Sequence, residues 1–189
     1  MIHEVIVTTR NSAGQVHIAP MGIHWRDNRV VISPFKPSTT LENLLKRRDA
    51  VINYCDDVRV FAGCLTGHYE WPVQQALKVD VPRLQDALAH SEVRLESIEE
   101  DELRPRLLCS VVHDANHRPF RGFNRAQAAV LELAILVSRL ERLPRSKIQR
   151  ELAYLRIAID KTAGTREHEA WGWLMDRIDG HLGQMEAGQ

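Results

Sequence analysis

The sequence predicts an α+β protein in which the strands come first and the helices last. Over residues 1 to about 120, short stretches rich in β-branched residues alternate with turn signals, as expected for strands. From Phe123 onward, apolar residues recur at the three- and four-residue spacing that marks helices. Strands followed by helices along one chain are typical of the α+β class. We therefore expect two regions, residues 1–120 and 123–189.

Six or so strands are expected in the first region. The Asp-Asn dipeptide at residues 27–28 is a hairpin signal between the second and the third strand. Pro20 and Gly22 interrupt the second strand, which fits a sheet edge or a place of close backbone approach. Residues 56–67 allow either a helical turn or a strand, and Pro82 can begin a short helix. The expected strands are residues 2–9, 15–25, 29–33, 50–55, 91–99 and 106–114.

A short amphipathic helix is expected between the third and the fourth strand. Thr39 is a suitable N-cap, and Glu42 three residues later completes a capping-box pattern. Leu41, Leu44 and Leu45 then fall on one face of the helix. This pattern predicts a helix that begins next to Thr39 and buries its leucines.

The first turn of this helix is suited to a phosphate group, because its N–H groups are unpaired and the helix dipole is positive there. Ser38, Thr39 and Thr40 could add hydroxyl donors, and Lys36 a positive charge. The alternative is a capped surface helix without a ligand. Taken alone the pattern favours this alternative, because capping boxes are common and the carboxylate of Glu42 already interacts with the dipole.

Three helices are expected after Phe123. The apolar residues of the first cover most of its circumference, which predicts burial on most sides. Together with Trp171 and Trp173, they give the region more apolar surface than three solvent-facing helices need. We therefore expect a homodimer to which these helices contribute. The helix boundaries are marked by Ser146 with Gln149 as a second capping box, by Gly164 and by Thr165.

Glu132 is a carboxylate inside the otherwise apolar first helix of this region. Arg125 and Arg139 lie seven residues to either side of it, two turns away along the same face. A buried carboxylate needs a partner, because an isolated one is costly to desolvate. We favour a salt bridge in helix packing or in a dimer interface over a catalytic role for Glu132.

Composition and charge argue against several classes of function, although a local basic patch stays possible. Lys and Arg together number 25, as do Asp and Glu, so no global field attracts nucleic acid or an anionic membrane. Three cysteines without CxxC spacing predict reduced thiols rather than a disulfide framework. The first residues lack a signal-peptide pattern, and the most apolar stretch, residues 128–137, is too short to cross a bilayer. We therefore expect a cytoplasmic protein.

The common catalytic and metal-binding motifs are missing from the sequence. There are nine histidines but no HExxH motif, and no serine or cysteine lies in a GxSxG elbow. His113 and His117 are four residues apart, but they flank turn-forming residues in an expected loop, so we interpret them as surface or hairpin histidines. No metal site is expected, and no residue can be named as a catalytic acid or base.

Several short segments together resemble the family catalogued as domain of unknown function 447. Hydroxyl residues, then Thr40 and Asn43, a short helix and a strand with Asn53 also resemble the FMN phosphate-binding segment of flavin-reductase-like split barrels. Members of the family are FMN-binding split-barrel proteins that are typically homodimers. The segments that carry the resemblance are residues 4–9, 19–22, 39–44, 124–126 and 130–132.

The resemblance implies a split β-barrel over residues 1–120, FMN as the cofactor, and a C-terminal three-helix extension over residues 123–189. It implies a flavin-dependent oxidoreductase that acts on a small molecule, with tetrahydromethanopterin-linked one-carbon metabolism as one option. The alternatives are a non-enzymatic FMN-binding protein or subunit of a larger complex, and a protein without a ligand. The cofactor-binding residues that it implies are Ala19, Pro20, Met21, Gly22, Lys36, Ser38, Thr39, Thr40, Asn43 and Asn53.

Overall fold

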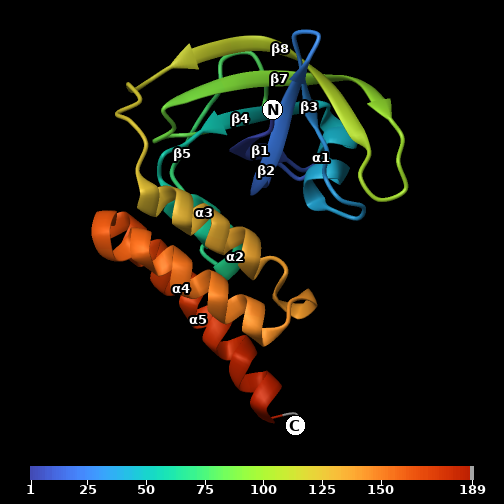
Figure 1. The fold of residues 1–189 in the computed structure, drawn as a ribbon. Coiled ribbons are helices and arrows are strands. Elements are labelled where there is room, and N and C mark those ends of the chain that lie inside the picture. Colours follow the sequence, from blue (N-terminus) through green and yellow to red (C-terminus); the bar gives the residue numbers. More distant parts are fainter. Residues whose placement is uncertain (188–189) are drawn as a thin grey trace. The chain divides into compact units, whose positions relative to one another are not determined.

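The computed structural model describes residues 1–187, which divide into two compact units (Figure 1). The barrel unit consists of Met1–Cys55 and Glu70–Phe120. The helical unit consists of Asp56–Tyr69 and the chain from Arg121 onward. The expected α+β fold, a split β-barrel followed by helices, is confirmed. Among the described residues, no helix is both long and apolar enough to cross a membrane.

The barrel unit is built on six antiparallel strands that close in the order β1-β2-β3-β8-β7-β4. Side chains alternate between the two faces of each strand, so every second residue points into the barrel. The barrel core consists of aliphatic side chains from all six strands. The strands are β1 (His3–Arg10), β2 (Val16–Arg26), β3 (Arg29–Ile32), β4 (Asp49–Tyr54), β7 (Ala89–Glu99) and β8 (Arg106–Asn116).

The proline and the glycine in β2 can be explained by the way this strand pairs and packs. β1 pairs with β2 along its whole length, but β3 pairs only with Ile23–Arg26. Pro20 therefore lies where one side of the strand has no partner, a position that tolerates a proline. A Cβ on Gly22 would lie 2.9 Å from Cγ2 of Ile2, so the exposed Ile2 side chain packs closely over this glycine and would have to shift if it were replaced. The turn at residues 27–28 has φ angles of 51° and 61°, as in a two-residue hairpin.

Helix α1 (Thr39–Arg47) covers part of the barrel core, because Leu41 and Leu44 pack among the core side chains. Its N-cap is Ser38, whose Oγ accepts a hydrogen bond from the N–H of Leu41 at 3.4 Å. The prediction of Thr39 as the N-cap was therefore wrong by one residue. The helix ends at Arg48, whose φ of 62° turns the chain directly into β4.

Residues 70–88, which we call the strap, lie against the outer face of the barrel. Val79 and Val81 of the strap pack on Val51 of β4, whose neighbour Ile52 points into the barrel. The strap contains a small antiparallel pair, β5 (Val73–Gln74) and β6 (Arg83–Leu84). The prediction of a short helix after Pro82 was wrong, because the residues that follow it are extended and hydrogen-bonded to the barrel.

The helical unit contains the C-terminal helices and one further helix from the middle of the chain. Residues 56–67, which the sequence left open, form α2, and Val58 and Ala62 of this helix share a core with Leu133 and Leu174. The prediction of a capping box at Ser146 was wrong, because the N-cap of α4 is Pro144, two residues earlier, and it forms no side-chain cap hydrogen bond. The helices are α2 (Val58–Thr66), α3 (Arg125–Val137), the 3-10 helix η1 (Leu140–Arg142), α4 (Arg145–Thr162) and α5 (Thr165–Ala187).

The three side chains of the helical region that the sequence analysis discussed differ in how deeply they are buried. Trp171 is buried in the helical core, and Trp173 is half-buried and stacks on His68, with ring centroids 4.0 Å apart. Glu132 is exposed on α3 and forms no salt bridge with any residue that the structure describes. The prediction of a buried carboxylate in the packing of this helix was therefore wrong within one copy of the chain.

Candidate functional site

The residues that the sequence analysis assigned to cofactor binding lie at three places in the barrel unit. Residues 19–22 form the middle of β2 and are half-buried. Lys36 and residues 38–43 form the start of α1 and the loop before it. Asn53 lies on β4. The first two places are neighbours, because α1 packs against β1 and β2.

The first turn of α1 offers backbone donors. Ser38 uses its Oγ and its carbonyl oxygen to accept the N–H groups of Leu41 and Glu42. Within residues 1–187, the structure shows no acceptor for the N–H groups of Thr39 and Thr40. The side chain of Thr39 is exposed beside them. Two free N–H groups, a hydroxyl and the positive end of the helix dipole form an arrangement that can hold a phosphate.

Thr40 and Asn43 face the barrel rather than solvent, and both are buried. Nδ2 of Asn43 donates a hydrogen bond to Oγ1 of Thr9 at 3.0 Å. Thr9 is the register partner of His17, which lies two residues before Ala19 on the same face of β2. The structure thus brings the buried side of α1 next to the predicted segment of β2, with Thr9 between them.

Lys36 is bound to the turn that joins β7 and β8. Its Nζ lies 2.8 Å from Oε2 of Glu100, and its N–H donates to the carbonyl oxygen of Leu103. Next to it, the guanidinium of Arg104 lies 4.5 Å above the ring of Phe35. The ion pair of Lys36 is exposed to solvent and contributes little to stability, so this lysine can exchange its partner for an anionic ligand.

Asn53 lies on the other face of the sheet and fastens the strap. Its Nδ2 donates to the carbonyl oxygen of Ile6 at 3.1 Å, and its Oδ1 accepts the N–H of Leu84 at 2.7 Å. It shares this outer face with Thr8, which lies next to Thr9 on β1 and therefore points the opposite way. The structure does not bring Asn53 together with Asn43 and Thr40.

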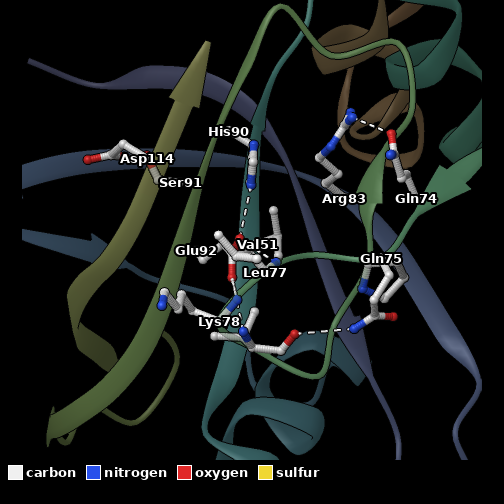
Figure 2. A network of polar contacts seen from close by, with 12 residues as sticks. Val51, Gln74, Gln75, Leu77, Lys78, Arg83, His90, Ser91, Glu92 and Asp114 are labelled. Atoms are coloured by element: carbon white, nitrogen blue, oxygen red, sulfur yellow. Dashed lines mark hydrogen bonds and ion pairs between the residues drawn. The ribbon is translucent and has the colours of Figure 1, made fainter. Parts of the chain in front are cut away.

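A group of histidines around Glu92 was not found by the sequence analysis. Figure 2 shows Glu92 with the first of them, His90. Glu92 is fully buried under the strap and accepts N–H groups of Leu77 at 2.7 Å, Lys78 at 2.5 Å and Val79 at 2.9 Å. Nε2 of His90 lies 3.2 Å from Oε1 of Glu92. The backbone donors hold this carboxylate in one orientation on the outer face of β7.

Two further histidines complete the group. Nε2 of His117 lies 2.8 Å from Nδ1 of His90, and the two ring planes are nearly parallel, with an angle of 10° between them. The ring of His113 meets that of His90 edge-on, with centroids 5.8 Å apart. His113 lies within β8, not in the loop predicted from the sequence, and is the register partner of Glu92.

Burial and hydrogen bonding set the charges of the two buried residues in this group. Burial lowers the pKa of His90 and outweighs the opposing effect of Glu92. Burial alone would raise the pKa of Glu92, but the hydrogen bonds from the strap amides and from His90 lower it below its usual value. At neutral pH the imidazole is therefore neutral and the carboxylate is ionised.

The closed six-stranded barrel places the chain in the split-barrel class, and solved structures share this fold. The structure is similar to that of the FMN-bound protein MM1853 from Methanosarcina mazei, with a TM-score of 0.81 and 21% identity over 93% of this chain and 94% of that one. It is also similar to 2-nitrobenzoate 2-nitroreductase NbaA from Pseudomonas fluorescens, with a TM-score of 0.52 and 23% identity over 60% and 64% of the two chains. An FMN-binding protein from Thermus thermophilus gives a TM-score of 0.51 and 18% identity over 60% and 69%.

The family follows from the sequence match. Residues 3–118 match the model described as "Protein of unknown function (DUF447) N-terminal domain", and residues 124–176 match "Protein of unknown function (DUF447)". The chain belongs to this family, as its resemblance to the family implied. One relative is the uncharacterized protein MJ1453 of Methanocaldococcus jannaschii, which is 26% identical over 149 residues, 74% of this chain and 75% of that one.

Proposed function

We propose that this protein binds FMN in its barrel unit and uses the flavin as an oxidoreductase acting on a small molecule. The observation that carries the proposal is the similarity over 93% of the chain to a protein solved with FMN bound, whose description names the same family. The Pseudomonas fluorescens nitroreductase and the Thermus thermophilus FMN-binding protein share the fold and support the same assignment.

The start of α1 is the part of this chain that fits the phosphate of FMN. The free N–H groups of Thr39 and Thr40 would donate to it, with the hydroxyl of Thr39 and the ammonium of Lys36 beside them. The backbone of residues 19–22 on β2 would contact the ring system, because a strand with one unpaired side leaves its polar groups available. Asn53 is not part of this proposed site, since its carboxamide fastens the strap.

The bound flavin would supply the electron transfer, and the protein would supply its position and its polarity. The finer assignment, a pterin-type substrate linked to tetrahydromethanopterin metabolism, rests on the family resemblance alone. Anaerobic mixing of the FMN-loaded protein with NADH or NADPH, followed by a pterin acceptor, tests the catalytic part of the proposal. Flavin that neither donor reduces would favour the non-enzymatic alternative, an FMN-binding protein or a subunit of a complex.

Replacement of one backbone donor tests the phosphate site. Thr39 is the first residue of α1, where proline is tolerated, and Ser38 before it is extended with φ of −157° and ψ of 148°. Thr39→Pro therefore removes the N–H while the helix persists, and Thr39→Ala is the matched control that keeps it. A hydrogen bond to a charged group contributes about 1.5–3 kcal/mol, so Thr39→Pro should weaken FMN binding by about tenfold or more.

Riboflavin separates a lost phosphate contact from a damaged pocket, because it has the same ring without the phosphate. Titrations followed by flavin fluorescence should show that Thr39→Pro binds riboflavin as the parent does. Equal losses for both flavins would mean that α1 shapes the pocket without binding the phosphate. If the parent chain shows no saturable FMN binding at micromolar concentrations, the flavin proposal fails altogether.

A further inference from the structure

We propose that His90, Glu92 and His113 form a binding site for a divalent transition-metal ion on the outer face of the barrel. Each residue offers one ligand atom, and the three atoms lie within 4.8 Å of one another. Two imidazoles and one carboxylate are the protein ligands of many zinc and non-haem iron sites, which leave further positions open. The site is separate from the start of α1 and does not depend on flavin binding.

The strand pairing brings these ligands together. His90 and Glu92 are two residues apart on β7, so both point to the outer face. His113 is directly opposite Glu92 on β8, and such cross-strand partners have neighbouring side chains. The ligands therefore come from two adjacent strands of a closed barrel, which is a rigid support.

The distance between His90 and Glu92 suits a shared ion. Nε2 of His90 and Oε1 of Glu92 are 3.2 Å apart. Two atoms that each lie about 2.0–2.1 Å from a tetrahedral zinc ion are roughly 3.4 Å apart. The ion would thus replace the single proton that Nε2 of His90 and Oε1 of Glu92 share in the metal-free protein, and a rotation of the half-buried His113 ring would supply the third ligand.

Hydrogen bonds from neighbouring groups orient the proposed ligands, as is usual in metal sites. Three strap amides hold Glu92 in place, and they would remain bonded when Oε1 contacts the ion. When Nε2 of His90 binds a metal, its Nδ1 carries the proton and can donate to Nε2 of His117, 2.8 Å away. Such second-shell hydrogen bonds fix the tautomer and the direction of a metal-binding histidine.

Zinc titration of the full chain, first freed of metal with a chelator, tests the site by calorimetry. We expect saturable binding of one Zn²⁺ per chain. His113→Ala removes a ligand but none of the bonds that hold the strap, so it should weaken binding on the order of 100-fold. His3, an exposed histidine on β1, supplies the matched control, and His3→Ala should bind Zn²⁺ as the parent does. His117→Ala should weaken binding by about 10–100-fold as a second-shell change.

Co²⁺ gives a readout that needs no variant. In the parent chain it should produce the intense visible d–d absorption of a four-coordinate site, which one equivalent of Zn²⁺ abolishes. The faint spectrum of a hydrated six-coordinate ion would overturn the proposal, and so would the absence of saturable binding. Unchanged zinc affinity in a folded His113→Ala variant would overturn it as well, because the ion would then be bound elsewhere.

Discussion

Asp57 shows at the scale of one residue how a buried carboxylate is kept ionised. Its Oδ1 accepts the N–H of Arg59 at 3.1 Å and so caps α2. Its Oδ2 lies 2.7 Å from the guanidinium of Arg59 and 3.5 Å from that of Arg166 on α5. Glu169 binds the far side of Arg59 at 3.0 Å. Burial alone would raise the pKa of Asp57, but the hydrogen bonds and charges of the two arginines lower it.

Asp57→Asn separates the charge from the cap, because asparagine is an equally good N-cap. We expect a loss of about 1–3 kcal/mol in the free energy of unfolding at pH 7, from the weaker hydrogen bonds to the arginines. A carboxyl group whose pKa is lowered by folding stabilises the protein above its unfolded value of about 3.9, and this contribution disappears as the pH falls through the folded value.

Urea unfolding of the parent and of Asp57→Asn between pH 7 and pH 3 tests this prediction. The difference between the two proteins should be constant at the upper end of the range and should shrink below about pH 4. Glu169→Gln, which changes the exposed end of the same ion pairs, should cost less than about 1 kcal/mol. A difference for Asp57→Asn that does not depend on pH would show that the variant acts through the cap or through packing.

At the scale of the structural elements, three buried polar side chains from neighbouring strands hold the strap against the barrel. Thr8 on β1 donates to the carbonyl oxygen of Pro82 at 2.6 Å, and Asn53 on β4 accepts the N–H of Leu84 at 2.7 Å. Glu92 on β7 accepts three further strap amides. Buried polar groups are costly when unpaired, so these side chains hold the strap in place together with the apolar contacts of Val79 and Val81.

Asn53→Ala tests whether this residue serves the strap. The change removes a hydrogen bond to the carbonyl oxygen of Ile6 and leaves the buried N–H of Leu84 without its side-chain acceptor, which should cost about 1–3 kcal/mol of stability. Hydrogen exchange followed by mass spectrometry should show faster exchange over residues 82–88 and unchanged exchange over α1. FMN affinity should stay within about threefold of the parent value. A large loss of FMN affinity with a protected strap would restore the role in cofactor binding that the sequence suggested for Asn53.

Elements with a local signal could be predicted from the sequence. The Asp-Asn turn has the positive φ angles that its residue types favour, and Pro20 lies where β2 has an unpaired side. The helical spacing of Thr40 and Asn43 also places them on the face of Leu41 and Leu44, so their burial follows from the same pattern that predicted the helix. Their assignment to the FMN phosphate came from the resemblance of this segment to that of flavin-reductase-like split barrels.

Features that depend on the pairing of distant segments could not be predicted. The shared face of His90 and Glu92 can be read from their spacing, but the place of His113 depends on the register of β7 and β8. That register shifts between Glu92 and Val93, at an irregularity that no residue type marks. The role of α2 was missed for a similar reason, since its core partners lie some 70 residues or more further along the chain.

For the whole molecule, the helical unit leaves an apolar groove between α3 and α4 uncovered in one copy of the chain. Tyr154 and Ile157 on α4 are 72% and 49% exposed beside it. Arg125 and Glu132 of α3 also line the groove, and neither forms a salt bridge with a described residue. An acidic and a basic residue two turns apart on one face are self-complementary, because a two-fold axis places each one opposite the other in a second copy.

We therefore predict a homodimer in which Glu132 of one copy pairs with Arg125 of the other across this groove. Light scattering at micromolar protein should give twice the mass of one chain. Glu132→Arg places like charges together and should raise the dissociation constant about tenfold or more, whereas the swapped pair Arg125→Glu with Glu132→Arg should restore it. Asp160→Arg, a reversal at an exposed position of α4 outside the groove, is the control and should leave the mass unchanged. A monomeric mass for the parent would contradict the prediction of a dimer. If the dissociation constant is the same in the parent and in all the variants, the dimer interface lies on another surface.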